Sequence, residues 1–321
     1  MQRILFGLFA ALCLSLAASV HAQAWPTRPV KFIVPFTPGT GMDTIARIVA
    51  PRLAERLGQS VVVENRPGAS GNIGTDAVAK AAPDGYTLMV GANTMLMAAN
   101  LYKSVPFNPL TDFAPISLAG WGTLMLATNP KTGIVSVADL IAKAKAAPGK
   151  LTYGSPGVGT PHHMAMELFK DLTGTDLLHI PYTGSAGAVI DILSGATDLM
   201  FIPVHVAMPY VKAGKLKALA VGSPKRHAMA PEVASLQELG INGAEVDMWF
   251  AFLAPRGTPP AIIIRLNSEL RAILATPEVK SAFEKLGLEA ASNSGAEMSA
   301  LMEKDYARWA LVIKRNNISA E

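Results

Sequence analysis

The chain has 321 residues, of which 50% are hydrophobic and 16% charged, and its formal net charge is +4. This composition excludes an intrinsically disordered chain, and the length is sufficient for two lobes, each with its own core. Lys and Arg are dispersed among acidic residues, without a basic block or interleaved aromatic residues, so the sequence predicts no nucleic-acid partner.

The first 24 residues have the pattern of a secretory signal peptide. Arg3 gives a short positive region, Ile4 to Val20 is apolar, and Ala22-Gln-Ala24 places small residues at both cleavage positions. A membrane anchor is the alternative, but an apolar run of about 17 residues is at the lower limit for spanning a bilayer. The turn-forming Trp25-Pro26 favours cleavage. We therefore expect residues 1–24 to be removed from an exported, soluble protein.

Cys13 is the only cysteine and lies inside this segment, after Leu12, which is too large for the usual lipoprotein cleavage site. The mature chain would hold no cysteine, which excludes disulfides, a catalytic thiol and thiolate metal ligands.

Strand and helix patterns alternate along the first hundred residues. Strands are predicted at 30–34, 60–64 and 86–90, and helices at 43–57 and 73–82. Hydrophobic residues recur every four positions in the first helix, Gly58 ends it, and Pro51 is expected to kink it or to shift its ends. Such alternation predicts a parallel sheet with helices on both faces.

The middle of the chain repeats this alternation, and the last third is helical. Helices are predicted at 137–147, 163–172, 188–193, 259–274, 277–286 and 296–314, and strands at 151–153, 177–180, 198–202 and 216–221. The last helices are expected to pack back on the first lobe, which needs two crossings, near Leu118–Thr128 and Asp247–Ala254.

The sequence thus predicts an α/β fold of two lobes, each a mainly parallel sheet flanked by helices. Residues 25–124 plus 247–321 would form lobe 1 and residues 125–246 lobe 2, with two crossing segments as the hinge.

Two glycine-rich loops, each between a strand and a helix, are the most informative feature. They are Pro35-Phe-Thr-Pro-Gly-Thr-Gly41 and Gly154-Ser-Pro-Gly-Val-Gly-Thr160. Unpaired N–H groups and the dipole at a helix amino terminus favour an anion. Thr40 or Asp43 is expected to cap the first helix, and Ser155 and Thr160 add hydroxyl donors to the second loop. The two loops predict a ligand held between two lobes.

Ser155 also suggests a comparison with the G-x-S-x-G turn of serine hydrolases. The position two residues before it is Tyr153 instead of glycine, and the later histidines follow without the expected order of acid and histidine. A secreted hydrolase that uses Ser155 with a remote histidine is the enzymatic alternative.

We expect neither a metal nor a nucleotide cofactor. His163 and Glu167 lie one helical turn apart, but His162 and His163 point in different directions and no third ligand follows at a suitable spacing. The glycines at 68, 71 and 74 do not fit G-x-G-x-x-G.

Further segments follow one another in a recognisable order. They are Trp25-Pro-Thr-Arg-Pro29, Ile33-Val-Pro-Phe-Thr-Pro-Gly39 with Asp43, Val63-Glu-Asn-Arg-Pro-Gly-Ala69 with Gly71-Asn-Ile-Gly74, Pro83-Asp-Gly-Tyr-Thr87, Tyr153-Gly-Ser-Pro-Gly-Val-Gly159 with His163, His179-Ile-Pro-Tyr-Thr-Gly184, Lys212-Ala-Gly-Lys215 and Ala254-Pro-Arg-Gly-Thr-Pro259. In this order they resemble the Bug family of periplasmic solute receptors, the substrate-binding components of tripartite tricarboxylate transporters. The resemblance extends almost to the C-terminus.

The resemblance implies a type II-like periplasmic binding fold with a carboxylate in the interlobe cleft, held by backbone N–H groups, hydroxyls and ordered waters, without a dedicated arginine. By position, the ligand-binding residues would be Phe36, Pro38, Gly39, Thr40, Gly41 and Asp43 in the first loop, Tyr153, Ser155, Gly157, Gly159, Thr160 and His163 in the second, and Asn93, Thr94 and Asp198 as further lining residues.

It further implies a monomeric receptor in the periplasm, with no enzymatic activity and no cofactor, that delivers its solute to the membrane permease subunits of the transporter. A ligand sensor with the same fold is a second alternative that the sequence does not separate from it.

Three positions depart from the family pattern. Thr40 stands between two glycines that are usually adjacent, Ile202 and Pro203 stand where an acid or amide is common, and Ala251 replaces a glycine. Ile202 and Pro203 favour a less polar site and a solute with an apolar body over an amino acid.

Overall fold

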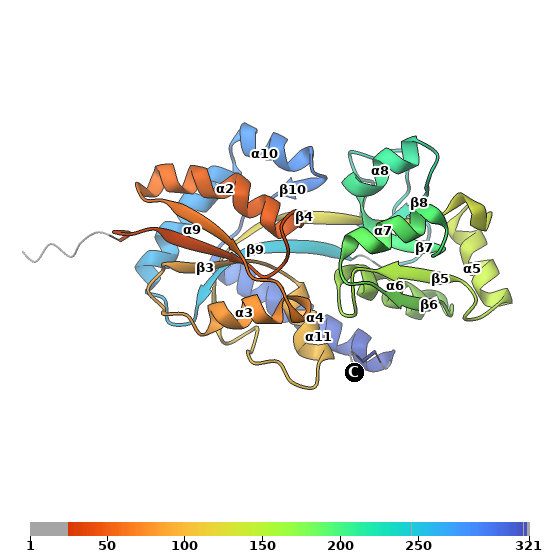
Figure 1. The fold of residues 1–321 in the computed structure, drawn as a ribbon, viewed down its shortest axis with the longest axis horizontal. Coiled ribbons are helices and arrows are strands. Elements are labelled where there is room, and N and C mark those ends of the chain that lie inside the picture. The colour runs from red at the N-terminus through yellow and green to blue at the C-terminus, as the bar shows by residue number, and fades with distance from the viewer. Residues whose placement is uncertain (1–24, 245, 317, 320–321) are drawn as a thin grey trace, which may run out of the picture.

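The computed structural model describes residues 25–244, 246–316 and 318–319. Two lobes lie side by side along the longest axis and are joined by two strands that run between them (Figure 1). The predicted signal peptide, residues 1–24, lies outside the described residues. Within the part that is described, no helix is both long and apolar enough to cross a membrane.

The first lobe is a sheet between two layers of helices. Its strands are β1 (Val30–Val34), β2 (Val61–Asn65), β3 (Thr87–Ala92), β9 (Asp247–Pro255), β10 (Leu288–Ala290) and the first part of β4 (Phe113–Thr128). The helices on one face are α2 (Gly41–Leu57), α9 (Pro260–Leu274) and α10 (Pro277–Glu284), and those on the other are α3 (Asn72–Ala79), α4 (Thr94–Leu101) and α11 (Gly295–Arg315), with the short turn η2 (Ala69–Gly71) before α3.

The second lobe repeats this arrangement on the last part of β4. Its strands are β5 (Thr152–Ser155), β6 (Leu178–Pro181), β7 (Leu199–Pro203) and β8 (Lys217–Val221). The helices α5 (Val137–Ala146) and α6 (Pro161–Thr173) pack in one core, and α7 (Ser185–Ser194) and α8 (Val204–Lys212) pack in the other; the short turn η3 (Pro130–Thr132) follows β4.

The strand β4 belongs to both lobes. It pairs with β9 from Phe113 to Thr123, and with β7 and β8 between Leu124 and Thr128. β9 runs antiparallel beside it, so the two crossing segments expected from the sequence are parts of these two strands. The change of partners between Thr123 and Leu124 marks where the chain passes from one lobe to the other.

The sheets differ from the sequence prediction in one respect, because each is mixed instead of mainly parallel. β1 is parallel to β2 and β3, and β5 is parallel to β6 and β7, as expected. β4, β8, β9 and β10 add antiparallel pairs. The reason is that the two crossing strands run in opposite directions and pair with each other.

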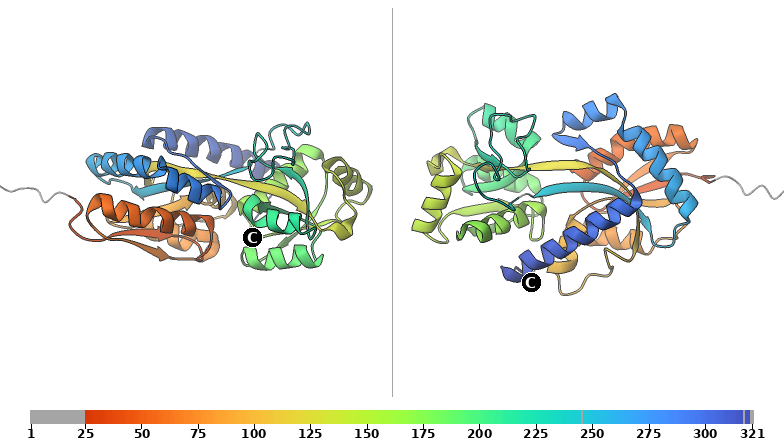
Figure 2. Two further views of the ribbon diagram at one scale, coloured as in Figure 1. Left: turned by 90° about the horizontal axis from the view of Figure 1, so that it is seen from above. Right: turned by 180° about the vertical axis from the view of Figure 1, so that it is seen from behind.

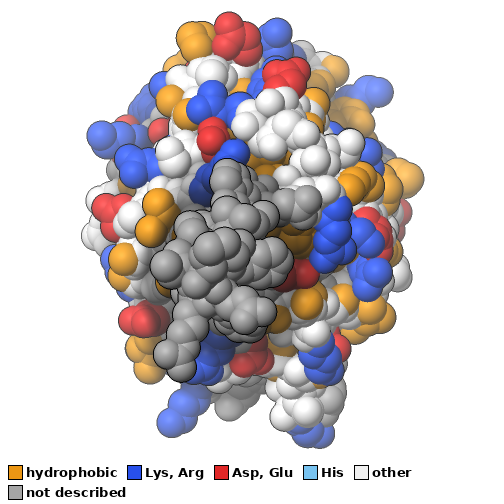
Figure 3. All heavy atoms as spheres, turned by 90° about the vertical axis from the view of Figure 1, so that its left-hand side faces the viewer, with side chains coloured by type: hydrophobic (Ala, Val, Ile, Leu, Met, Phe, Trp, Pro, Cys, Tyr) orange, Lys and Arg blue, Asp and Glu red, His pale blue; other side chains and the backbone are white. Residues whose placement is uncertain are grey.

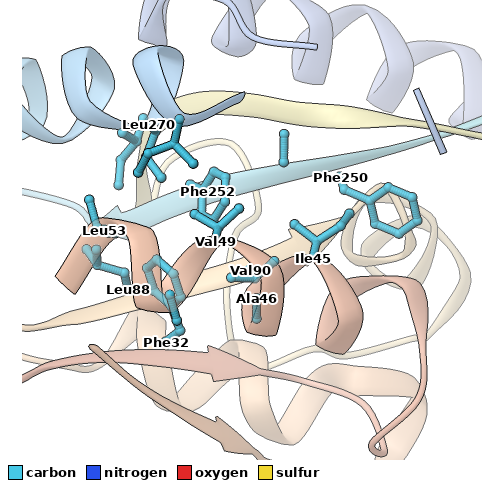
Figure 4. Packing of buried hydrophobic residues seen from close by; sticks show 14 of the residues in the cluster. Phe32, Ile45, Ala46, Val49, Leu53, Leu88, Val90, Phe250, Phe252 and Leu270 are labelled. Carbon is cyan, nitrogen blue, oxygen red and sulfur yellow. The ribbon is translucent and has the colours of Figure 1, made fainter. Parts of the chain in front are cut away.

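The helix α2 runs without interruption through Pro51 and ends at Gly58, which has a left-handed backbone (φ 69°). Pro51 does not move the carboxyl end of the helix, which lies at Leu57 as predicted. The helix continues through Pro51 because this residue lies on its exposed side, where solvent can reach the carbonyl that lacks an N–H partner. On the buried side, Val49 lies beside Phe252 and Ile45 beside Phe250, in the same core as Phe32 (Figure 4). This packing fixes the amino end of α2 at the edge of the sheet.

Charged side chains do not gather on the end of the first lobe. On the face that Figure 3 shows, outside the grey atoms, basic and acidic side chains are interspersed, as their dispersal in the sequence predicts.

The helix α11 crosses behind the two connecting strands (Figure 2). Met298 and Met302 pack in the first lobe, whereas Trp309 and Ile313 pack in the core of the second. In the middle of the helix, Asp305 accepts a hydrogen bond from Nε1 of Trp249 on β9 at 2.8 Å. Burial raises the pKa of the Asp305 carboxyl above its ordinary 3.8, and this hydrogen bond opposes the rise.

The raised pKa predicts how Asp305 affects stability. The folded protein holds the Asp305 proton more tightly than the unfolded chain does. Asp305 therefore lowers the free energy of unfolding more and more as the pH rises from 3.8 through the raised pKa. Asp305→Asn keeps an oxygen for Trp249 but does not titrate. Its free energy of unfolding, measured by urea denaturation between about pH 4 and 7, should rise relative to that of the wild type.

Asp139→Asn is the matched control. A hydrogen bond from the Val135 N–H lowers the pKa of Asp139, so this variant should lose free energy of unfolding relative to the wild type as the pH rises. A pH-independent difference for Asp305→Asn would contradict the interpretation.

Candidate functional site

The sequence-predicted loops lie at the carboxyl ends of the parallel strands. We call residues 35–40, between β1 and α2, the first loop, and residues 156–160, between β5 and α6, the second loop. Figures 1 and 2 show the amino end of α2 directed toward the second lobe, whose loops before α6 and α7 face it. In open α/β sheets, ligands bind outside the carboxyl ends of the strands, and the two edges meet here.

Asp43 holds the first loop in shape from inside. Its buried carboxylate accepts hydrogen bonds from the Gly39 N–H at 2.9 Å, from Nε of Arg47 at 3.0 Å and from Nδ2 of Asn65 at 2.9 Å. The same Asn65 amide donates to the carbonyl of Phe36. Burial raises the pKa of Asp43, but these hydrogen bonds outweigh it, and the net pKa lies below its ordinary value. Asp43 is therefore a charged brace of the loop.

The amino end of α2 has no side-chain cap, so the expected cap from Thr40 or Asp43 is wrong. The Thr40 hydroxyl donates to the carbonyl of Thr37 at 3.1 Å instead. Gly39 has a left-handed backbone (φ 85°), and a Cβ on Gly41 would lie 2.8 Å from the Phe250 ring. The N–H groups of the first turn of α2 are thus left without a side-chain acceptor beside an exposed loop.

The second loop uses its hydroxyl groups internally. The Ser155 hydroxyl lies 3.0 Å from the carbonyl of Gly157 and 2.7 Å from Nε2 of His179. The Thr160 hydroxyl donates to the same carbonyl at 2.8 Å and accepts from the His163 N–H, so it caps α6. The hydroxyl donors that the sequence predicted for an anion therefore stabilise the loop.

A stack of three rings supports the second loop from below. The centroids of Tyr153 and His163 lie 4.7 and 4.1 Å from that of His179. Tyr153 donates its hydroxyl hydrogen to Glu167, which also accepts from Nζ of Lys170 at 2.8 Å. Tyr153 and His163 thus lie beneath the loop, in the core of the lobe.

Burial keeps these histidines neutral at pH 7. It lowers the pKa of His163 to about 4 and that of His179 to about 3, the latter with a contribution from His163. The Gly159 N–H donates to Nδ1 of His163 at 3.1 Å, which assigns the proton of this ring to Nε2. His162 is also buried with a pKa lowered to about 4. No histidine in this stack therefore carries a positive charge at pH 7 that could attract an anion.

The amino end of α7 is a second uncapped helix start near the second loop, and the sequence prediction missed it. The helix begins at Ser185 after Gly184, whose φ is 107°, and it has no side-chain cap. Ser185, Ala186 and Gly187 are exposed. The Gly184 N–H donates to the carbonyl of Pro156 in the second loop at 2.9 Å, which ties the two segments together. The sequence had placed the start of this helix at Ala188, although the Gly184-Ser185 pair is a signal for an earlier start.

Three further predicted site residues lie in different places. Thr94 is buried and follows β3 at the edge that carries the first loop. Asn93 is fully buried. Its backbone N–H donates to the carbonyl of Trp249, and its side chain forms a hydrogen bond with the Asp305 carboxyl. Asp198 accepts from the backbone and hydroxyl of Thr152, at the opposite end of β5 from the second loop. The structure therefore does not bring Asp198 to the site.

Ile202 and Ser155, on which two of the sequence-based expectations rest, are both fully buried. Ile202 is fully buried in the core with α7 and α8, so it gives no support to a less polar site. Ser155 lies beside His179, as a hydrolase would need, but it is fully buried, and a substrate has no access to its hydroxyl. Among the described residues, no cluster of three or more His, Cys, Asp or Glu could hold a metal ion.

Residues 45–318 match the family described as the tripartite tricarboxylate transporter family receptor. The chain belongs to this family. It is 39% identical over 320 residues to protein BugT of Bordetella pertussis, a match that covers 98% of this chain and 97% of BugT. The family resemblance seen in the sequence is thereby confirmed.

Two solved structures share the two-lobe fold of this family member. Rpa4515 of R. palustris, solved with adipate, has a TM-score of 0.84 and 36% identity, over 92% of this chain and 99% of that one. MatC of Rhodopseudomonas palustris, solved with bound malate, has a TM-score of 0.81 and 28% identity, over 90% of this chain and all of the other.

The contacts of Asp43 lead to a stability prediction. Asp43→Asn replaces an acceptor of three hydrogen bonds by an amide that faces those donors with an NH2 group. We expect it to lower the free energy of unfolding by about 1–3 kcal/mol in urea denaturation. Asp84→Asn, which breaks an exposed ion pair with Arg28, is the control and should cost less than about 1 kcal/mol. Equal losses would contradict the role of Asp43 as a brace.

Proposed function

We propose that the protein is a periplasmic receptor that captures a small carboxylate between its lobes and delivers it to the permease subunits of a tripartite tricarboxylate transporter. One observation carries the proposal: the amino ends of α2 and α7 have no side-chain cap and face each other from the two lobes. Segments 35–43, 153–163 and 182–187 contain no Lys or Arg. Backbone N–H groups are therefore the donors that would hold the anion.

The physical basis is the partial positive charge at a helix amino terminus together with its unpaired N–H groups. A hydrogen bond from such a group to a carboxylate is charge-assisted. The donors are already fixed by the packing of α2 on its sheet and by the bond between Gly184 and Pro156, so binding orders few additional side chains.

Two donor sets in two lobes suit a solute with two carboxylates, or with one carboxylate and a second acceptor. One lobe would bind first, and closure about β4 and β9 would bring the second set onto the solute. Closure is stabilised only by the difference in affinity between the closed and open arrangements. The dicarboxylates adipate and malate, which accompany the two structural relatives, support this class of solute.

We assign the site residues accordingly. Gly39, Thr40 and Gly41 would shape the first donor set, with Phe36, Pro38 and Asp43 holding it in place, whereas Gly157, Gly159 and Thr160 would support the α7 donors from the second loop. Residues 1–24 would direct export to the periplasm, where the protein would act as a monomer.

A thermal-shift screen of the mature chain tests the proposal. Adipate and malate represent the class, and adipamide, which lacks the charge, is the matched control. A solute that binds only the folded protein adds about 2.7 kcal/mol to the free energy of unfolding at a hundredfold excess over Kd. We expect an upward shift with a dicarboxylate and none with the diamide. Equal shifts with acid and diamide would contradict anion binding.

A substitution at the start of α7 tests the backbone donors. Ser185 is the first helical residue, where proline is tolerated because its missing N–H has no helical partner. Ser185→Pro should weaken binding of the dicarboxylate found in the screen by about tenfold in calorimetry. Ser185→Ala keeps the N–H and should bind like the wild type. Loss of binding in Ser185→Ala alone would assign the contact to the hydroxyl instead.

A further inference from the structure

The turn η2 has an unusual backbone. Ala69 and Ser70 are the only residues other than glycine with a positive φ in the described part of the chain, at 47° and 53°. This left-handed conformation is unfavourable for residues that carry a Cβ, and it persists only where surrounding contacts enforce it. One such contact is visible: the hydroxyls of Ser70 and Tyr102 lie 3.0 Å apart, and either can donate.

On one side, this turn touches the first loop. Gly71 has a φ of 91°, and a Cβ on it would lie 2.6 Å from Cε2 of Phe36. The Phe36 ring therefore rests directly on the backbone of the turn. The Asn65 amide donates to the carbonyl of Phe36 and also to the carboxylate of Asp43. Asn65 thus connects Phe36, whose ring contacts the turn, with the Asp43 brace of the first loop.

On the other side, Tyr102 follows the end of α4, which reaches the second lobe. Leu101 belongs to the core of that lobe, and Tyr102 packs against it. A Cβ on Gly159 would lie 2.6 Å from Cδ2 of Leu101, so α4 rests on the backbone of the second loop. The N–H of this same Gly159 donates to His163, the bond that links the loop to the ring stack.

We infer that Ser70 and Tyr102 are positioning residues that couple the first loop to the second. The contacts form one continuous series across the lobes: Phe36 on Gly71, Ser70 to Tyr102, and Leu101 on Gly159. The hydroxyl pair is the polar link in the middle of this series. The inference rests on the proposed function, since it explains how the two donor sets keep one relative position before a solute arrives.

The surroundings of Tyr102 are consistent with a movable link. A cavity of about 330 Å³ lies beside the turn, lined by Ala69, Asn72, Ile73, Tyr102 and Pro106 among others. The Tyr102 ring therefore has free volume on one side. Loss of the hydroxyl pair would release both the ring and the left-handed turn toward this space.

Hydrogen exchange in the solute-free protein tests the coupling. The N–H groups of Gly39 and Gly159 are hydrogen-bonded within their loops and report on loop opening. Tyr102→Phe removes only the hydroxyl and should speed exchange in peptides covering both 36–44 and 156–164. Loss of one ordinary hydrogen bond corresponds to an increase of about two- to tenfold in the exchange rate.

A mutant cycle shows whether the two hydroxyls act as one link. Ser70→Ala should produce the same increase as Tyr102→Phe, and the double variant should add nothing further. Tyr86→Phe is the matched control, because it removes a tyrosine hydroxyl that contacts Thr27 in the same lobe. It should leave both loop peptides unchanged. Faster exchange confined to residues 68–76 in Tyr102→Phe would overturn the coupling.

A binding measurement with adipate distinguishes failure of the coupling from failure of the proposed function. If the wild type binds adipate, Tyr102→Phe should weaken binding by about two- to tenfold, with Tyr86→Phe unchanged. Unchanged affinity together with unchanged loop exchange would refute the coupling while leaving the receptor intact. Because the exchange experiment needs no solute, its result stands even if no dicarboxylate binds.

Discussion

The continuous strand β4 is the constraint on which the rest of the structure depends. It pairs with β9 in the first lobe and with β7 and β8 in the second, and the change occurs between Thr123 and Leu124. One hydrogen-bonded ribbon therefore joins both sheets, and it directs their carboxyl edges toward each other. Because parallel strands carry their following loops at this edge, the fold alone places two helix amino ends on opposite sides of one space.

The side chains around these helix ends are engaged in holding the loops. Asp43 accepts the hydrogen bonds that shape the first loop. In the second loop, the hydroxyls of Ser155 and Thr160 donate to the carbonyl of Gly157, and His163 accepts from the Gly159 N–H. None of these side chains caps α2 or α7, so the backbone N–H groups at both helix starts have no side-chain acceptor. A site of this kind recognises the charge and spacing of carboxylates more than the body of the solute, which fits a receptor family whose relatives were solved with solutes as different as adipate and malate.

The sequence predicted the elements whose burial is one-sided. Hydrophobic residues such as Ile45 and Val49 recur with a helical period and predicted α2, because only one face of that helix is covered. Helix α4 was missed because Met95, Leu96 and Met97 are all buried and leave no periodic pattern. The site loops were found from their glycines, but the roles of their side chains were not. Their partners Asn65, Glu167 and His179 come from other elements, and spacing along the chain does not show which of them meet.

A crystal structure with a bound dicarboxylate would show whether backbone N–H groups of both lobes hold the solute. We expect one carboxylate about 3 Å from N–H groups at the start of α2 and another acceptor at the same distance from N–H groups at the start of α7. A carboxylate held instead by an Arg or Lys side chain, or bound away from both helix starts, would contradict recognition by the backbone.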